Sequence, residues 1–210
     1  LHQSLVDLAT GENAMMRPLA PTPTSTPTQT GEATELLSDL GAHYLAGLLT
    51  HARGMTVMCT PTTNGFERFK PNALAPHAIV WGRDNRGAML RVIGQAGDAA
   101  TRIENRLGEP AANPYLYMAA QIHAGLAGID QRLVPPRATA DPYGQGATDG
   151  LVPNNLGEAL DALTADPAMR AGFGDAFINY YEQIKRPEQQ RYEAAEDKRA
   201  FHTRAYFSRI

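Results

Sequence analysis

Six arginines lie between residues 68 and 106, and several stand in strand-like or turn segments among apolar neighbours rather than on a polar helix face. Arg91 is the clearest case, because it interrupts the apolar run at residues 89–93. A buried guanidinium needs an anionic partner, and its planar fork binds carboxylate or phosphate through paired hydrogen bonds. The set therefore indicates a fold that gathers arginines around an anionic ligand, although any single one could instead pair with a neighbouring carboxylate. The six are Arg68, Arg83, Arg86, Arg91, Arg102 and Arg106.

The segment at residues 102–106, Arg-Ile-Glu-Asn-Arg, alternates with the period of a β-strand. Successive side chains of a strand point to opposite faces, so we expect Arg102, Glu104 and Arg106 on one face. A carboxylate between two arginines is either part of a neutralised structural trio or a metal ligand flanked by anion-binding groups. The spacing alone leaves both interpretations open.

The first half of the chain predicts one long helix and a pair of strands. Apolar residues recur at helical spacing from Glu35 to about Ala52, with Thr34 as the expected N-cap and Gly54 as the expected end. Two strand-like runs follow at residues 77–81 and 88–93, and we expect them to pair across the polar turn between them.

The second half predicts three helices. Proline suits a first helical turn, so a helix is expected from Asn113-Pro114 to about Ile129. Residues 155–158 have the form of a capping box and predict a short helix through Leu163. A further helix is expected over residues 167–185, with Pro187 stopping it.

Composition excludes several classes of protein. With 43% hydrophobic residues, 20% charged residues and a net charge of -3, the chain is neither a dedicated nucleic-acid binder nor a membrane protein. Its one cysteine, Cys59, cannot form an internal disulfide and is expected to pack as a small hydrophobic side chain, so a cytoplasmic protein is the simplest interpretation. The chain opens Leu-His-Gln-Ser-Leu without an initiator methionine, so we expect it to be the end of a longer protein.

Several segments resemble, in the same order, motifs of the glutamine synthetase family. Residues 2–5, His-Gln-Ser-Leu, resemble the end of its His-x-His-x-Ser-Leu motif, and residues 61–68 resemble its Pro-Thr-x-Asn-Ser-Tyr-x-Arg segment. Residues 81–86, Trp-Gly-Arg-Asp-Asn-Arg, and the later Arg91 match its arginine-bearing strands. Residues 102–115 are similar to its Arg-x-Glu-x-Arg…Pro-Ala-Ala-Asn-Pro-Tyr signature, which is the most specific of these matches.

The resemblance covers essentially the whole chain, but only the second half of a typical family member. It implies an α+β fold in which a curved antiparallel sheet cradles ATP and glutamate and helices flank it. Residues 1–210 would be the C-terminal part of the catalytic domain, without its first part and without the N-terminal β-grasp-like domain. It also implies a homo-oligomer, typically a dodecamer-like pair of rings with sites between subunits.

The family's roles carry over to the matching residues. Glu104 would ligate Mg²⁺ or Mn²⁺, for which a carboxylate is a suitable hard ligand. Arg68 and Arg106 would bind the glutamate substrate. Arg86 and Arg91 would bind the ATP phosphates, with Arg86 as the catalytic group beside the transferred phosphoryl. The nucleotide site would also be lined by His2, Gln3 and Ser4; a lone histidine such as His2 is, from pattern alone, more often structural.

Two positions depart from the family pattern. Ala99 stands where the family has a phosphate-contacting lysine. The flap, which in the family reads Pro-Gly-Tyr-Glu-Ala-Pro, reads Pro-Asn-Ala-Leu-Ala-Pro, so Leu74 replaces the glutamate that accepts a proton from bound ammonium. Leucine cannot accept a proton, but it could line a pocket for a bulkier or more apolar amine.

The implied activity is therefore an ATP-dependent ligase that forms a γ-glutamyl amide from glutamate and an amine through γ-glutamyl phosphate. Two alternatives remain open at this point. One is an ordinary glutamine synthetase that uses ammonia, with another acid in place of the missing base. The other is a family member that has lost catalysis and serves as a binding or structural protein, against which the retained arginines and Glu104 argue. The sequence does not identify the amine.

Overall fold

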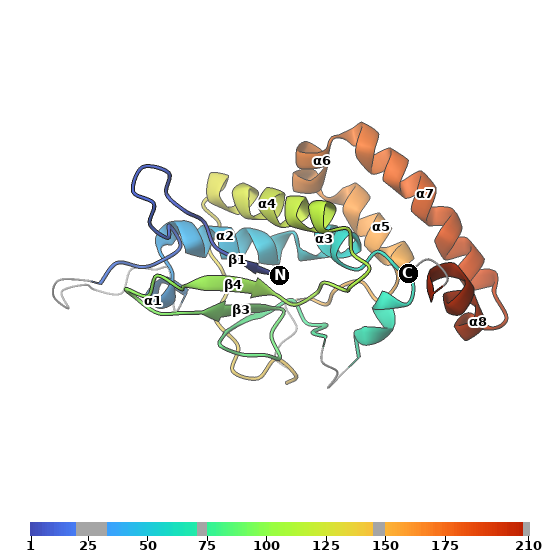
Figure 1. Cartoon of the computed structure of the whole chain (residues 1–210), viewed down its shortest axis with the longest axis horizontal. Coiled ribbons are helices and arrows are strands. Elements are labelled where there is room, and N and C mark those ends of the chain that lie inside the picture. Colours follow the sequence, from blue (N-terminus) through green and yellow to red (C-terminus); the bar gives the residue numbers. More distant parts are fainter. Residues whose placement is uncertain (20–32, 71–74, 145–149, 208–210) are drawn as a thin grey trace.

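The computed structural model describes residues 1–19, 33–70, 75–144 and 150–207. Four strands form one sheet in the order β1-β4-β3-β2, and helices cover one of its faces (Figure 1). Within the described ranges, no helix is long and apolar enough to cross a membrane. The strands are β1 (His2–Gln3), β2 (Trp81–Arg83), β3 (Leu90–Ile93) and β4 (Arg102–Asn105). The helices are α1 (Ala33–Leu36), α2 (Asp39–Thr50), α3 (Ala52–Cys59), α4 (Pro114–Asp130), α5 (Leu156–Ala165), α6 (Pro167–Phe173), α7 (Asp175–Ala194) and α8 (Lys198–His202), with the short turns η1 (Gly65–Arg68) and η2 (Thr203–Phe207).

The sheet is buried on one face by the alternation of its strands. Leu90 and Val92 of β3 and Ile103 of β4 are fully buried in the same core cluster as residues of α2, α3 and α4. Helices α2 and α3 follow one another along the sheet, and α4 lies beside them (Figure 1). Arg91 lies between Leu90 and Val92 and Glu104 follows Ile103, so both point to the opposite face. The helices α5, α6 and α7 extend this layer beyond one end of the sheet (Figure 1).

The sheet is mixed, which corrects one detail of the expected antiparallel arrangement. β1 and β3 both pair antiparallel with β4, but β2 and β3 run parallel, so they do not form a simple hairpin. The expected strand at residues 77–81 starts later, because only Trp81 belongs to β2. The chain after β2 returns along the sheet before β3 begins, and Leu90 then donates to the Val80 carbonyl at 3.1 Å.

The helix expected from Glu35 to Ala52 is divided into three. Ser38 starts α2 as its N-cap, and its hydroxyl accepts a hydrogen bond from the Gly41 amide at 3.1 Å. Gly54 lies inside α3 rather than ending a helix. A Cβ at Gly54 would stand 2.4 Å from the Asp166 carboxylate, so glycine here permits the close approach of the chain around α6.

In the second half, two expectations are confirmed and one is wrong. Asn113 caps α4, whose first residue is Pro114, and Asn155 caps α5. The helix expected at residues 167–185 is broken at Gly174, whose φ of 81° falls in the left-handed region that favours glycine. The second piece, α7, continues through Pro187 to Ala194. Proline removes one helical hydrogen bond, but it does not end this helix.

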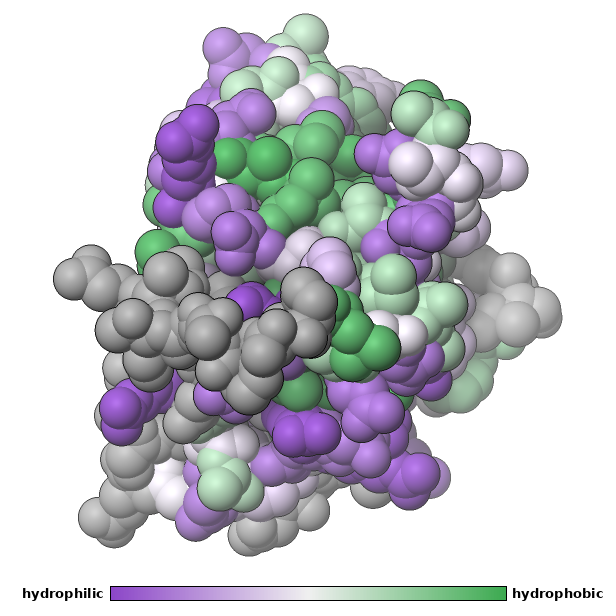
Figure 2. Space-filling model, turned by 90° about the vertical axis from the view of Figure 1, so that its left-hand side faces the viewer, coloured by the Kyte–Doolittle hydropathy of each residue, from purple (hydrophilic) through white to green (hydrophobic). Residues whose placement is uncertain are grey.

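The outer surface of the helical layer carries apolar side chains. On α4 the exposed residues Tyr115, Met118, Ile122 and Leu126 recur at helical spacing, whereas Ala120 and Ala124 are buried against α2. Viewed from the end of the molecule where α2 begins and α4 ends, hydrophobic surface gathers at the level of these helices, with hydrophilic side chains around it (Figure 2).

Candidate active site

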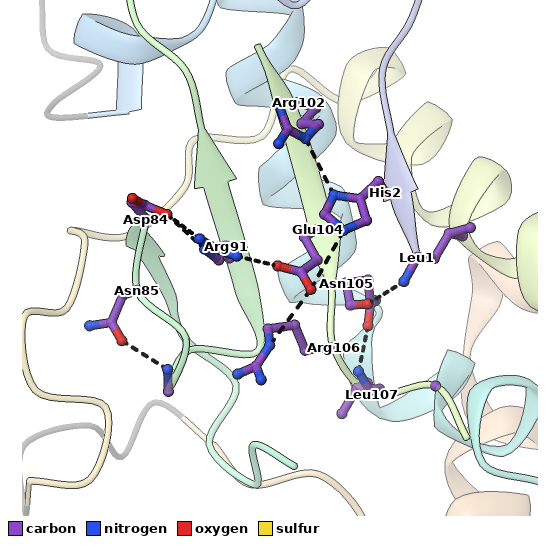
Figure 3. A network of polar contacts seen from close by, with 12 residues as sticks. Leu1, His2, Asp84, Asn85, Arg91, Arg102, Glu104, Asn105, Arg106 and Leu107 are labelled. Carbon is purple, nitrogen blue, oxygen red and sulfur yellow. Dashed lines mark hydrogen bonds and ion pairs between the residues drawn. The ribbon is translucent and has the colours of Figure 1, made fainter. Parts of the chain in front are cut away.

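Glu104 stands at the centre of a group of charged side chains on the open face of the sheet (Figure 3). Strand pairing puts its neighbours there, because His2 of β1 and Arg91 of β3 are both in register with Glu104. The Arg91 guanidinium donates to Glu104 Oε2 at 3.1 Å. Nε of Arg106 lies 3.8 Å and Nε2 of His2 lies 3.7 Å from Glu104 Oε1. The predicted alternation of residues 102–106 is confirmed, since Ile103 and Asn105 are buried on the other face.

Arg91 is held by two carboxylates. Besides Glu104, it donates to Asp84, which follows β2 directly, with Nε at 2.9 Å from the Asp84 carboxylate. These contacts, first that with Asp84 and then that with Glu104, raise the pKa of Arg91. The anionic partners expected for this arginine are thus present within the chain. Its role in binding ATP phosphates stays a prediction.

Arg68 differs from Arg91 in its partners. It is half-buried at the end of η1, and it donates to three backbone carbonyls, those of Gly65, Leu107 and Gly108, and to the hydroxyl of Thr60. Among the described residues it forms no ion pair with a carboxylate. Burial lowers its pKa, and the nearby carboxylate of Glu109 opposes this shift. The result is a partly desolvated cation whose hydrogen bonds to the described residues all go to neutral oxygens, with one N–H of Nη1 left over from its five.

A cavity of about 600 Å³ brings together three residues that the sequence assigned to substrate and metal. Arg68, Glu104 and Arg106 all line it, although Arg68 is far from the other two in sequence. A cavity with two guanidinium groups and one carboxylate suits an anionic or zwitterionic ligand of modest size. Its remaining lining residues are Leu1, Ala75, Asn105 and Gly108.

The other predicted site residues do not line this cavity. Arg86 is exposed in the connection between β2 and β3, and it forms no hydrogen bond or ion pair with the part of the chain that is described. Ser4 is exposed at the end of β1. Gln3 points away from Glu104 toward the helices, where it accepts from the Tyr44 hydroxyl at 2.8 Å and donates to Gln121 at 3.2 Å. Leu74 falls outside the described residues.

The residues present fit a metal site only in part. Glu104 supplies a carboxylate, the kind of hard oxygen ligand that Mg²⁺ and Mn²⁺ prefer. His2, whose Nε2 lies 3.7 Å from Glu104, could supply a second ligand atom, but no cluster of three or more His, Cys, Asp or Glu side chains within the described ranges could hold a metal ion. Glu104 could therefore contribute one ligand to a site whose other ligands lie outside this group.

Two carboxylates that the sequence offered only as possible partners of the arginines have definite contacts in the structure. Asp84 is the second partner of Arg91, and its place directly after a strand was the available signal. Glu109 fixes the segment before η1 by accepting hydrogen bonds from the amide and hydroxyl of Thr62, at 3.0 and 2.9 Å. Burial raises the pKa of Glu109. Cys59 is fully buried beside Gln121, as expected for a small hydrophobic side chain, and burial raises its pKa.

The chain resembles known proteins in sequence and in fold. Residues 1–203 match the family model of the glutamine synthetase catalytic domain. The chain is 44% identical over 197 residues to a gamma-glutamylanilide synthase from Acinetobacter sp, a match that covers 93% of this chain and 36% of that protein. It is 39% identical over 166 residues to a glutamine synthetase from Pyrococcus abyssi, covering 75% of this chain and 37% of that protein.

The fold also matches a solved structure of a GmaS/ADP complex. The TM-score is 0.73 at 30% sequence identity, and the match covers 99% of this chain and 45% of that one. The chain thus spans less than half of the length of the proteins it matches.

Proposed function

Because the chain belongs to the glutamine synthetase family, within whose catalytic domain it falls, we propose that the protein is an ATP-dependent ligase that joins the side-chain carboxylate of glutamate to an amine. The observation that carries the proposal is the cavity lined by Arg68, Glu104 and Arg106. In it, Arg68 is a partly desolvated cation whose hydrogen bonds go only to neutral oxygens, with Glu109 as a nearby carboxylate that it does not bond, and glutamate would supply a carboxylate that binds it directly.

The reaction would proceed in two balanced steps. A side-chain carboxylate oxygen of glutamate attacks the γ-phosphorus of ATP, and ADP leaves. The amine nitrogen then attacks the acyl carbon, loses a proton, and displaces phosphate. The released phosphate keeps the glutamate oxygen that attacked phosphorus in the first step. Arg68 and Arg106 would bind and orient glutamate, while Arg86 and Arg91 would stabilise charge on the phosphates.

A metal ion would bind in this cavity through Glu104. Its carboxylate is the group in the cavity that would ligate Mg²⁺ or Mn²⁺, and such an ion, when bound, neutralises phosphate charge. Arg91 and Arg106 on either side of Glu104 offset the negative charges of Glu104 and Asp84. The nucleotide role of His2, Gln3 and Ser4 is part of the same proposal, although the present contacts of Gln3 favour a structural role for its side chain.

The second substrate is proposed to be an amine larger than ammonia. Leu74 stands where the family places the proton-accepting glutamate of its flap. A leucine cannot accept the proton and would not favour a small cation, but it suits an apolar amine. The 44% identity to a protein named for forming a γ-glutamyl anilide supports the same direction.

An ordinary glutamine synthetase is the second candidate, supported by the 39% identity to the Pyrococcus abyssi enzyme. The substitution Leu74→Glu separates the two candidates. In an amine ligase it restores a proton acceptor, so the rate with ammonium should rise and the rate with an apolar amine should fall. In an ammonia-using enzyme it should change ammonium use little.

The direct test is ADP release by the intact protein with ATP, Mg²⁺ and glutamate. A panel of acceptors would include ammonium, ethanolamine, alkylamines, polyamines and aromatic amines. The proposal expects glutamate-dependent turnover with at least one organic amine and negligible turnover with ammonium alone. Ammonium as the best acceptor would favour the second candidate, and no turnover with any acceptor would reject both.

Two further features are proposed from the family. A homo-oligomer, arranged as two rings of subunits, would complete sites at subunit interfaces, and light scattering on the intact protein would give its mass. Cytoplasmic location agrees with the use of ATP and glutamate as substrates.

A further inference from the structure

The C-terminal elements α8 and η2 fold back onto the segment that carries Arg68. The Tyr206 hydroxyl, in η2, donates to Glu188 Oε1 at 2.7 Å. It accepts from the Thr63 amide at 3.0 Å, and the Thr63 hydroxyl lies 2.9 Å from the same oxygen. A phenol has one O–H donor and two acceptor lone pairs. These three contacts therefore use its whole hydrogen-bonding capacity.

The partner on the other side of Tyr206 is itself fixed. Glu188 lies on α7, where its second oxygen accepts from Lys185 at 2.7 Å. His202 of α8 adds a contact to η1, because its Nδ1 is 3.6 Å from the Glu67 carboxylate. The His202 ring also stacks on Tyr192 of α7, with the ring centroids 5.0 Å apart. The C-terminal elements thus contact both Thr63 and Glu67, which lie on either side of the start of η1.

The connection continues from Thr63 to Arg68 through short-range hydrogen bonds. The Gly65 amide donates to both the carbonyl and the hydroxyl of Thr62, each at 3.0 Å. The Gly65 carbonyl in turn accepts from Arg68 Nε at 3.2 Å. The turn at residues 62–65 therefore supplies one of the oxygens on which the Arg68 guanidinium rests. Movement of Thr63 would move that oxygen.

We propose that Tyr206 is a positioning residue for Arg68, acting through Thr63, and that it tunes the affinity of the cavity for glutamate. The effect on glutamate affinity rests on the proposed function, whereas the positioning of Arg68 by Tyr206 does not. Tyr206 does not line the cavity that holds Arg68, so it acts only through the turn. Its ring also packs against Phe201 and His202, and this packing stays when only the hydroxyl is removed.

The test compares Tyr206→Phe with the matched control Tyr192→Phe in the intact protein. Tyr192 belongs to the same aromatic cluster, but no hydrogen bond from its hydroxyl to the described residues is present. Tyr206→Phe should raise the KM for glutamate roughly tenfold, since it removes three hydrogen bonds, two of which hold Thr63 in the turn. The KM for ATP should change little, and the melting temperature should fall by roughly a few degrees. The control should leave all three unchanged.

Thr63 provides a second, independent pair of variants. Thr63→Val removes the hydroxyl contact and keeps the amide contact, so its effect should be smaller than that of Tyr206→Phe. Thr63→Ser keeps both contacts and should behave as the unmodified protein. Combining Thr63→Val with Tyr206→Phe should add nothing to the tyrosine variant, because the same contact is already lost.

Hydrogen–deuterium exchange without substrate separates this inference from the proposed function. Tyr206→Phe should speed exchange in the peptide covering residues 61–70, and Tyr192→Phe should not. If the protein has no glutamate-dependent activity, the proposed function fails, and this exchange result still decides the positioning role. Unchanged exchange, or a KM for glutamate that rises no more than the KM for ATP, would overturn the inference.

Discussion

Single residues decide what the cavity can bind, and Arg68 is the most informative of them. A guanidinium that has lost part of its water and donates hydrogen bonds only to neutral oxygens can still bind an anion directly, although the Glu109 carboxylate lies nearby. Arg91, by contrast, already has two carboxylates. The two arginines looked alike in sequence, and only their surroundings distinguish them.

Arg68→Met should therefore weaken glutamate binding strongly. A charge-assisted hydrogen bond contributes about 1.5–3 kcal/mol, so we expect the KM for glutamate to rise roughly tenfold to a hundredfold. The matched control is Arg83→Met, because Arg83 is exposed on β2 and lies outside the cavity. Steady-state kinetics would check both variants. An equal effect of the two would contradict the assignment of Arg68.

Glu109 gives a pH dependence of stability with a definite sign. Burial raises its pKa above the ordinary value of 4.5. The folded state then holds the proton to a higher pH than the unfolded chain does, so the free energy of unfolding contributed by this group falls as pH rises through that window. Glu109→Gln cannot titrate. In urea unfolding between about pH 4 and pH 7, the stability of the unmodified protein relative to the variant should fall as pH rises. Parallel profiles would rule out this contribution.

At the scale of elements, the packing of α2 on α4 depends on a close approach of their backbones. A Cβ on Gly47 would stand 2.2 Å from the Ala124 carbonyl oxygen and 2.8 Å from the Gly128 nitrogen. Backbone atoms at such distances cannot move aside as a flexible side chain can. The close packing of α2 on α4 therefore requires glycine at position 47, despite the low helix propensity of glycine.

Gly47→Ala tests this contact by the sign of its effect. Helix propensity alone would stabilise the protein by about 1 kcal/mol. The clash instead predicts a loss of about 1–3 kcal/mol in the free energy of unfolding. Gly41→Ala, on the same helix but with its nearest atoms at 3.2 Å, should cost less. Denaturant unfolding of both variants distinguishes the two effects, and a stabilised Gly47→Ala would refute the close packing.

Features with local causes were predictable from the sequence. The start of α4 follows from Asn113 and Pro114, and the alternation of β4 follows from its side-chain period. Gly54 and Gly174 could not be distinguished in the same way. Gly54 lies inside a helix, where Asp166 packs against it. Gly174 breaks a helix by its positive φ. Such roles depend on residues far away in the chain.

The same division holds for the candidate site. The alternation that puts Glu104 and Arg106 on one face was predicted, but the strand pairing that brings His2 and Arg91 beside Glu104 was not. The parallel run of β2 could not be read from the sequence, because it depends on the segment at its outer edge, where Thr139 donates to the Trp81 carbonyl at 2.9 Å. The contact between Tyr206 and Thr63 joins residues 143 positions apart, and no local pattern reports it.

At the scale of the whole molecule, one layer of helices frees the opposite face of the sheet for charged side chains. The buried face carries Leu90, Val92 and Ile103, and the open face carries Arg91 and Glu104. The C-terminal elements α8 and η2 contact the segment that carries Arg68. The fold thus brings Arg91, Glu104 and Arg106, to which the proposed reaction assigns phosphate, metal and glutamate, to one side of the sheet.

The most direct test of the central claim is the transfer of oxygen from glutamate to phosphate. Glutamate labelled with ¹⁸O in its side-chain carboxylate would be given to the intact protein with ATP, Mg²⁺ and the best amine from the panel, and the products would be analysed by mass spectrometry. The account predicts a γ-glutamyl amide and one labelled oxygen in each phosphate released. An amide formed without label in the phosphate, or labelled phosphate without any amide, would contradict it.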